Sequence, residues 1–235
     1  MNADDSPEDA PATKRALDSY WLLEGVSLLV LNALGGLYVQ GEDNIPASGQ
    51  VLCVANHVSY LDPVGIGDAC TRRVVFMAKS QLFKVPVLGS LLRGVDAFPV
   101  RRGEADRVAF RNTLDMLAEG RVVCIFPEGK RSPDGALQPA EAGAAVFAMK
   151  TSCPVVPVYV SGTNEMLDRR GKLHRGRVTV AFGKPFTIAR KTDRDDAARQ
   201  LMAAIADTRD VNDGQPSRRI YPHRITKPRE GSRAR

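Results

Sequence analysis

The sequence is poor in the residues that build metal centres and disulfide frameworks. It has three histidines among 235 residues, and none of them is spaced as part of a ligand pair, so a zinc enzyme is disfavoured. The four cysteines form no Cys-x-x-Cys pair, and three of them lie in or beside apolar runs, where a small hydrophobic side chain fits. We therefore expect a reduced, intracellular protein.

Features of secreted and hydrolytic proteins are also missing. No G-x-S-x-G elbow occurs and no cysteine is marked as activated, which disfavours a serine or cysteine hydrolase. The chain opens without a signal peptide. Its residues 1–15 are acidic and rich in proline and alanine, so we expect them to be a disordered lead-in.

No uninterrupted apolar run clearly exceeds the length needed to span a membrane. The most apolar stretch, 20–39, barely reaches the ~20 apolar residues of a spanning helix. On a helical wheel, Glu24, Ser27, Asn32 and Gly35 fall within one sector of about 140°. We expect 16–40 to be an apolar helix or helix pair that lies partly in the membrane interface or docks on the domain, with a buried core helix as the alternative.

Positive charge is concentrated at one end of the chain. The net charge is +6, and the segment from Gln215 onward holds seven Lys/Arg against one Glu. Residues 1–214 balance at 26 basic and 26 acidic side chains. We interpret 213–235 as a basic, disordered tail that an anionic membrane surface would attract. A nucleic-acid partner is not expected, because no RNA-binding aromatic signature accompanies the basic residues.

Strands alternate with helices over the central part of the chain, 41–212, which we expect to be one domain. Short apolar runs with β-branched residues predict buried strands at 51–55, 74–77, 122–126, 154–160 and 177–182. Amphipathic or small-residue patterns predict helices at 63–71, 104–120, 141–150 and 193–207. The order favours an α/β fold: one mixed, largely parallel sheet flanked by helices, plus the N-terminal apolar helix or helix pair.

The strand predicted at 51–55 delivers a histidine and an aspartate at its end. His57 emerges there, and Asp62 lies five residues on, a spacing that a regular helix would turn by about 140°. Pro63 favours an irregular turn, which would let the two side chains meet. An imidazole held by a carboxylate at one nitrogen can take a proton from a hydroxyl at the other, as a general base does. The alternative is that Asp62 is a helix cap and His57 is structural.

Two further strand ends carry charged side chains. Arg101 and Arg102 follow a short extended piece, and a Glu-Gly-Lys-Arg turn, 128–131, follows the strand predicted at 122–126. Because ligands bind at the carboxyl ends of strands in α/β sheets, these groups could converge with His57. A base beside guanidinium groups suits group transfer to a phosphorylated alcohol.

Four blocks of sequence together resemble the PlsC-like glycerolipid acyltransferases, the family typified by 1-acylglycerol-3-phosphate acyltransferase. NHVSYLD at 56–62 is similar to its His-x4-Asp block, FPVR at 98–101 to its second block, FPEGKRS at 126–132 to its third and VVPVYVSGT at 155–163 to its fourth. AKSQLF at 78–83 resembles a common segment between the first two blocks. The similarity runs from about Leu37 to Phe186, in the right order and spacing.

The resemblance implies transfer of a fatty acyl group from acyl-CoA or acyl carrier protein to the free hydroxyl of a lysophospholipid. The leading acceptor is 1-acylglycerol-3-phosphate, which would give phosphatidic acid. His57 would be the general base and Asp62 its orienting partner, with no acyl-enzyme, cofactor or metal. The substrate-binding positions that the resemblance implies are Lys79, Arg101, Glu128, Gly129 and Arg131. It also implies a peripheral protein at the cytoplasmic face of the cell membrane.

Two departures from the family pattern bear on the acceptor. Lys130 replaces the usual threonine, and the second block places its arginine further from Gly94 than is usual. Other acceptors therefore stay open, among them other lysolipids, glycolipids and glycerol 3-phosphate. A thioesterase, in which water replaces the acceptor, and a binding protein acting through the basic tail are the remaining alternatives.

Overall fold

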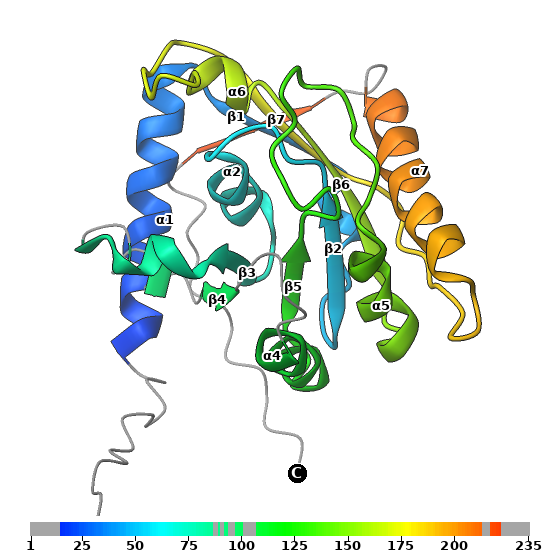
Figure 1. Cartoon of the computed structure of the whole chain (residues 1–235). Helices are drawn as coiled ribbons and strands as arrows, with labels where there is room; N and C mark the ends of the chain where they lie inside the picture. Colours follow the sequence, from blue (N-terminus) through cyan, green and yellow to red (C-terminus); the bar gives the residue numbers. More distant parts are fainter. Residues whose placement is uncertain are drawn as a thin grey trace, which may run out of the picture.

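A computed structural model gives the fold and describes residues 15–86, 89, 92, 93, 97–100, 107–212 and 217–221. Their strands are β1 (Leu37–Gln40), β2 (Val51–Ala55), β3 (Val74–Lys79), β4 (Phe98–Val100), β5 (Val122–Ile125), β6 (Val155–Ser161), β7 (Val178–Phe182) and β8 (Arg218–Ile220). These strands form one sheet in the order β4-β3-β5-β2-β6-β7-β1-β8 (Figure 1).

The sheet is mixed but mostly parallel. Parallel pairing joins β4, β3, β5, β2 and β6 in turn, and also joins β7 to β1. The pairs β6 with β7 and β1 with β8 are antiparallel. The carboxyl ends of β2 to β6 therefore share one edge of the sheet. The predicted α/β fold, with a mixed and largely parallel sheet, is confirmed.

Helices cover both faces of this sheet. The longer ones are α1 (Arg15–Leu34), α2 (Asp62–Ala69), α4 (Arg107–Ala118), α5 (Ala142–Thr151) and α7 (Arg194–Asn212). Short turns are η1 (Glu42–Asn44), η2 (Ser80–Lys84) and α6 (Thr163–Met166). Side chains of α1 and α2 belong to the core on one face, and those of α4, α5 and α7 to the core on the other. Figure 1 shows these two groups of helices on opposite sides of the sheet. Among the described residues, no helix has the length and hydropathy to cross a bilayer.

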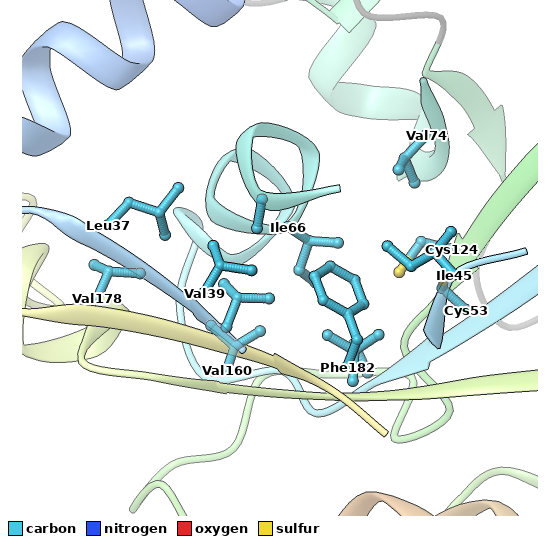
Figure 2. Packing of buried hydrophobic residues seen from close by; sticks show 14 of the residues in the cluster. Leu37, Val39, Ile45, Cys53, Ile66, Val74, Cys124, Val160, Val178 and Phe182 are labelled. Carbon is cyan, nitrogen blue, oxygen red and sulfur yellow. The ribbon is translucent and has the colours of Figure 1, made fainter. Parts of the chain in front are cut away.

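Strand β2 is buried on both faces. This burial explains why its sequence is a continuous apolar run. Val51, Cys53 and Ala55 face the core beneath α2, which Figure 2 shows, and Leu52 and Val54 face the opposite core. All five residues are inaccessible to solvent. Successive side chains of a strand point to opposite faces of the sheet. When both faces are buried, every residue of the strand is therefore apolar.

The expectation that 16–40 is wholly helical is wrong at its end. α1 is one continuous helix over its described range, but it ends at Leu34, and residues 37–40 form the strand β1. Gly35 has φ +141°, and a Cβ there would lie 2.0 Å from the carbonyl oxygen of Gly176. After the Gly-Gly break, Leu37 and Val39 alternate with less buried residues and pair with β7. Alternate residues of 37–40 are therefore buried, as in a strand, and the helix does not continue.

The expectation of a disordered tail from 213 is also wrong for three residues. β8 adds to the outer edge of β1, and Ile220 is buried opposite Leu37. Backbone pairing and the burial of one apolar side chain explain why this short piece is ordered. The expected lead-in lies outside the described residues except for Arg15, as do the residues beyond Tyr221.

Candidate active site

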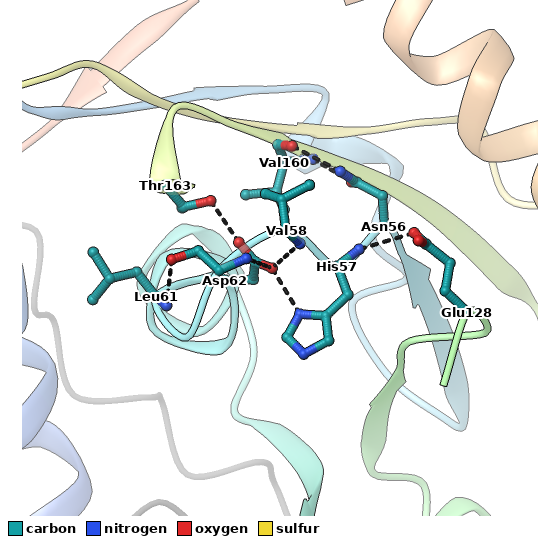
Figure 3. A network of polar contacts seen from close by, with 9 residues as sticks. Asn56, His57, Val58, Leu61, Asp62, Glu128, Val160 and Thr163 are labelled. Atoms are coloured by element: carbon teal, nitrogen blue, oxygen red, sulfur yellow. Dashed lines mark hydrogen bonds and ion pairs between the residues drawn. The ribbon is translucent and has the colours of Figure 1, made fainter. Parts of the chain in front are cut away.

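His57 and Asp62 meet just beyond the end of β2. The imidazole Nδ1 lies 2.7 Å from Asp62 Oδ2, and the same oxygen accepts the backbone N–H groups of Val58 and Ser59 at 2.7 and 2.8 Å (Figure 3). The loop thus folds back on the first residue of α2, which is the irregular turn that the five-residue spacing required. Asp62 is fully buried and His57 is 9% exposed.

The imidazole is held by ring packing as well as by the carboxylate. Its centre lies 4.1 Å from that of Phe126, with the rings 21° apart. When Nδ1 donates to Asp62, the neutral ring keeps its lone pair on Nε2, which Figure 3 shows on the side away from the aspartate. Such a ring can accept a proton from a hydroxyl, and the adjacent carboxylate stabilises the cation that forms.

Thr163, at the start of α6, and Asn56, just after β2, complete the site, and sequence reasoning gave them no role. Thr163 donates its hydroxyl to Asp62 Oδ1 at 2.5 Å. The Asn56 side chain donates to the Val160 carbonyl at 2.9 Å and accepts the Val160 N–H at 2.7 Å. Both contacts join segments about 100 residues apart in the chain, so no local spacing reveals them. The only sequence signal was that Thr163 ends the fourth block.

Glu128 ties the loop after β5 to the histidine. Its Oε1 accepts the backbone N–H of His57 at 3.0 Å, and Oε2 accepts that of Gln138 at 3.3 Å. Ser132 N–H donates to the His57 carbonyl at 2.7 Å. Burial raises the pKa of the Glu128 carboxyl above its usual value. The two backbone N–H groups that donate to it lower the pKa, but by less. Both oxygens are thus bonded to backbone groups, which links the loop after β5 to His57. The contact with the acceptor that the resemblance implied stays a prediction.

Gly129 and Arg131 occupy the same turn. Gly129 has φ +65° and donates its N–H to the Phe126 carbonyl at 3.0 Å, so it shapes the backbone. Arg131 is exposed, and its guanidinium carbon lies 3.6 Å from the centre of the Tyr60 ring. Tyr60 belongs to the loop between His57 and Asp62. The turn therefore carries a cationic side chain to the loop that holds the base.

Of the two remaining predicted positions, Lys79 is the one that the structure describes. Lys79 is exposed at the end of β3, which is two strands from β2 in the sheet. β4 runs parallel to β3 and ends at Val100. Arg101 and Arg102 lie outside the described residues, so their convergence with His57 stays a prediction.

Other catalytic groups find little support in the part of the chain that the structure describes. It contains no group of three or more His, Cys, Asp or Glu residues that could hold a metal ion. All four cysteines are free. Burial raises the pKa values of the Cys53 and Cys124 thiols well above the ordinary value for cysteine. These raised pKa values disfavour the nucleophilic thiolate form.

The family model described as Acyltransferase matches residues 36–161, more than half of the chain. The chain therefore belongs to the acyltransferase family, and its resemblance to the PlsC-like enzymes that act on 1-acylglycerol-3-phosphate is confirmed.

Particular relatives agree with this assignment. The chain is 31% identical to a chloroplastic 1-acyl-sn-glycerol-3-phosphate acyltransferase from Brassica napus, over 70% of this chain and 49% of the relative. It is 29% identical to the Bacillus subtilis enzyme of the same name, over 67% of this chain and 77% of the relative. The match thus spans about half the length of the plant protein.

A solved structure shares the fold. The 1-acyl-sn-glycerophosphate acyltransferase PlsC from Thermotoga maritima superposes with a TM-score of 0.68, over 83% of this chain and 79% of that chain. Sequence identity between the two is 23%. The arrangement of sheet and covering helices is therefore common to both proteins.

Proposed function

We propose that this protein transfers a fatty acyl group from acyl-CoA or acyl carrier protein to the free hydroxyl of a lysophospholipid. The acceptor we propose is 1-acylglycerol-3-phosphate, and the product is phosphatidic acid. The observation that carries the proposal is the 2.7 Å contact between His57 Nδ1 and Asp62 Oδ2 at the carboxyl end of β2. The names of the relatives supply the substrate class.

In the proposed reaction, His57 acts as a general base. Its Nε2 takes the proton of the acceptor hydroxyl while the hydroxyl oxygen attacks the thioester carbonyl carbon. The carbon–sulfur bond then breaks, and the imidazolium returns the proton to the departing thiolate. No acyl-enzyme forms and no metal or cofactor takes part, so both substrates must be bound together. Asp62 keeps Nδ1 as the donor nitrogen and stabilises the cation.

Arg131 is the residue we propose to bind the acceptor phosphate. Its guanidinium group is exposed and rests on Tyr60, which belongs to the loop of the base. A guanidinium group can bind a phosphate through two parallel hydrogen bonds, which fixes direction as well as distance. Lys79 and Arg101 are proposed as further cationic contacts at the same sheet edge. Glu128 and Gly129 would act indirectly, by shaping the turn that presents Arg131.

A peripheral position on the cytoplasmic face of the cell membrane is part of the proposal. α1 supports it, because its outward side is apolar although its inward side already packs Leu28 and Leu31 into the core. Ser27 donates to Asp68 of α2, and Asn32 donates to the Ile220 carbonyl of β8, so polar residues face the protein. The opposite side exposes Leu22, Val26, Leu29 and Val30. An exposed apolar stripe of this kind suits insertion into a lipid interface.

The test is acyl transfer by the purified protein, with labelled acyl-CoA or acyl carrier protein and vesicles containing 1-acylglycerol-3-phosphate. His57→Ala should lower turnover by ~10²-fold or more. His174→Ala is the matched control, because His174 Nε2 also pairs with a carboxylate, Asp168, at 2.9 Å, but on an exposed loop. That variant should keep its activity, and near-normal turnover by His57→Ala would refute the mechanism.

The products separate the other outcomes. Equal release of free fatty acid with and without acceptor would identify a thioesterase. Faster transfer to a lysolipid or glycolipid that lacks the phosphate monoester would assign a different acceptor. A burst of thiol release before acceptor is added would reveal an acyl-enzyme, which this mechanism does not contain.

A further inference from the structure

We propose that Thr163 is a positioning residue for the base, and that its hydroxyl holds the Asp62 carboxylate in the orientation that receives the imidazole N–H. This inference rests on the proposed role of His57 and names a third member of its hydrogen-bond chain. The Thr163 hydroxyl donates to Asp62 and not to the imidazole. Its effect on the chemistry would pass through Asp62.

The two oxygens of Asp62 have different partners. Oδ2 lies 2.7 Å from His57 Nδ1 and also accepts two backbone N–H groups of its own loop, whereas Oδ1 accepts the Thr163 hydroxyl at 2.5 Å. That distance is in the range for a hydroxyl bonded to an ionised carboxylate. Asp62 and Thr163 are both fully buried, so water does not readily replace the hydroxyl. Without it, Oδ1 would be a buried charged oxygen that lacks its donor.

The surrounding backbone fixes Thr163 in place. It follows Gly162, which has φ +80°, and a Cβ on Gly162 would lie 1.8 Å from the Arg177 carbonyl oxygen. Three residues earlier, Val160 is bonded twice to the side chain of Asn56, the residue before His57. The segment from Val160 to Thr163 is therefore attached both to the side chain of Asn56, beside His57, and to the carboxylate of Asp62 (Figure 3). Holding a reacting group at two points limits the misplacement that lowers catalytic rates.

Removal of the hydroxyl has a predictable electrostatic sign. A carboxylate that loses a donor carries a less stabilised negative charge, so it attracts the neighbouring imidazolium more strongly. His57 should then hold its proton to a higher pH, and the acid limb of the rate profile should move in the same direction. A role in packing alone would change neither quantity.

The experiment is an NMR titration of the histidine rings of the full chain, which has three histidines, with His57→Ala used to assign the resonance. Thr163→Val should shift the titration of His57 upward by about 0.5–1 pH unit. Thr163→Ser keeps a hydroxyl and should restore the wild-type curve. Thr113→Val is the matched control, since Thr113 is equally buried but its hydroxyl donates to the Ala109 carbonyl at 2.8 Å.

Kinetics and a double variant complete the test. Thr163→Val should lower kcat by about ten-fold, leave the KM for the acceptor nearly unchanged and move the acid limb upward. In an Asp62→Asn background, the same change should no longer move the His57 titration. If Thr163→Val does not fold, Thr163→Ala takes its place with the same expectations.

An unshifted titration in a folded Thr163 variant, or the same shift in the Asp62→Asn background, overturns the inference. Because the titration needs no substrate, it can succeed even if acyl transfer to 1-acylglycerol-3-phosphate is not detected. Failure of the proposed function and failure of this inference are therefore distinguishable.

Discussion

The guanidinium carbon of Arg131 lies 3.6 Å from the centre of the Tyr60 ring, although the two residues come from different loops of the sheet edge. Tyr60 is 61% exposed, so its ring is not fixed by burial in the core. A cation over an aromatic face gains electrostatic attraction while its N–H groups remain free to bind an anion at their edge. The contact therefore couples the proposed phosphate-binding residue to the loop of His57.

Tyr60→Ala should raise the KM for 1-acylglycerol-3-phosphate by about two- to five-fold, because a cation–π contact at an exposed site contributes ~0.5–1 kcal/mol. Tyr60→Phe keeps the ring and should keep the wild-type KM. The matched control is Tyr221→Ala, since Tyr221 is another exposed tyrosine near an arginine, with Arg219 5.3 Å from its ring centre. Steady-state kinetics with varied acceptor measures the effect. Equal KM values for all these proteins would count against Arg131 as the phosphate-binding group.

Glu128→Gln tests whether this residue acts through the backbone. The N–H groups of His57 and Gln138 donate to different oxygens of Glu128, and glutamine replaces one of these oxygens with an NH2 donor, so one of the two contacts is lost. We expect the free energy of unfolding to fall by ~1–3 kcal/mol and turnover to fall with it, while the KM for the acceptor stays close to wild type. Chemical denaturation and acyl-transfer kinetics give the two quantities. Glu165→Gln, an exposed change on α6, is the control.

A selective rise in KM with unchanged stability would instead indicate direct contact between Glu128 and the acceptor. That outcome would favour the role implied by family resemblance over the role that we infer from the two backbone contacts.

Sequence reasoning succeeded where structure is set locally. The contact of His57 with Asp62 follows from a buried strand, a short loop and Pro63, all within a few residues. It failed where the local structure depends on a segment far away in the sequence. Residues 37–40 form a strand because Leu37 pairs with β7 and β8, which lie much later in the chain.

The same distinction applies inside the site. Thr163 reaches Asp62 across 101 positions of sequence, and only the fold brings the two together. The turn that carries Glu128 was recognised, but the direction of its carboxylate depends on the N–H groups of His57 and Gln138. Short motifs identify which residues lie near a site, while the tertiary contacts decide which of them can face a substrate.

The interface between α1 and α2 should make stability depend on pH. Burial raises the pKa of Glu24 to about 7 and that of Asp68 well above its usual range, and Glu24 raises the Asp68 value further. Glu24 Oε2 and Asp68 Oδ2 are buried without a hydrogen-bond partner among the described residues. Both groups therefore favour the protonated form when α1 is docked.

The sign follows from linkage. A carboxyl with a raised pKa in the folded state binds its proton more tightly there, so the folded state loses stability as pH rises from about 4.5 to about 7. Glu24→Gln removes this ionisation and should raise the free energy of unfolding at pH 8 by ~1–2 kcal/mol, because Glu24 is only partly buried and solvent screens its charge, with little change at pH 4. Denaturation at both pH values measures it, with Glu119→Gln, an exposed change on α4, as control. An equal effect at pH 4 and pH 8 would contradict the prediction.

Leu29→Glu tests the proposed contact of α1 with lipid. Leu29 is 62% exposed on the outer side of α1, so a charge there should leave the fold intact. Insertion of a leucine side chain into an apolar layer contributes ~1.5–3 kcal/mol, and an anionic surface repels a carboxylate, so binding to anionic vesicles should weaken by about ten-fold or more. Val108→Glu is the matched control, because Val108 is 70% exposed on α4, outside this stripe. Vesicle sedimentation gives the affinities, and equal losses in the two variants would exclude α1 as the specific membrane contact.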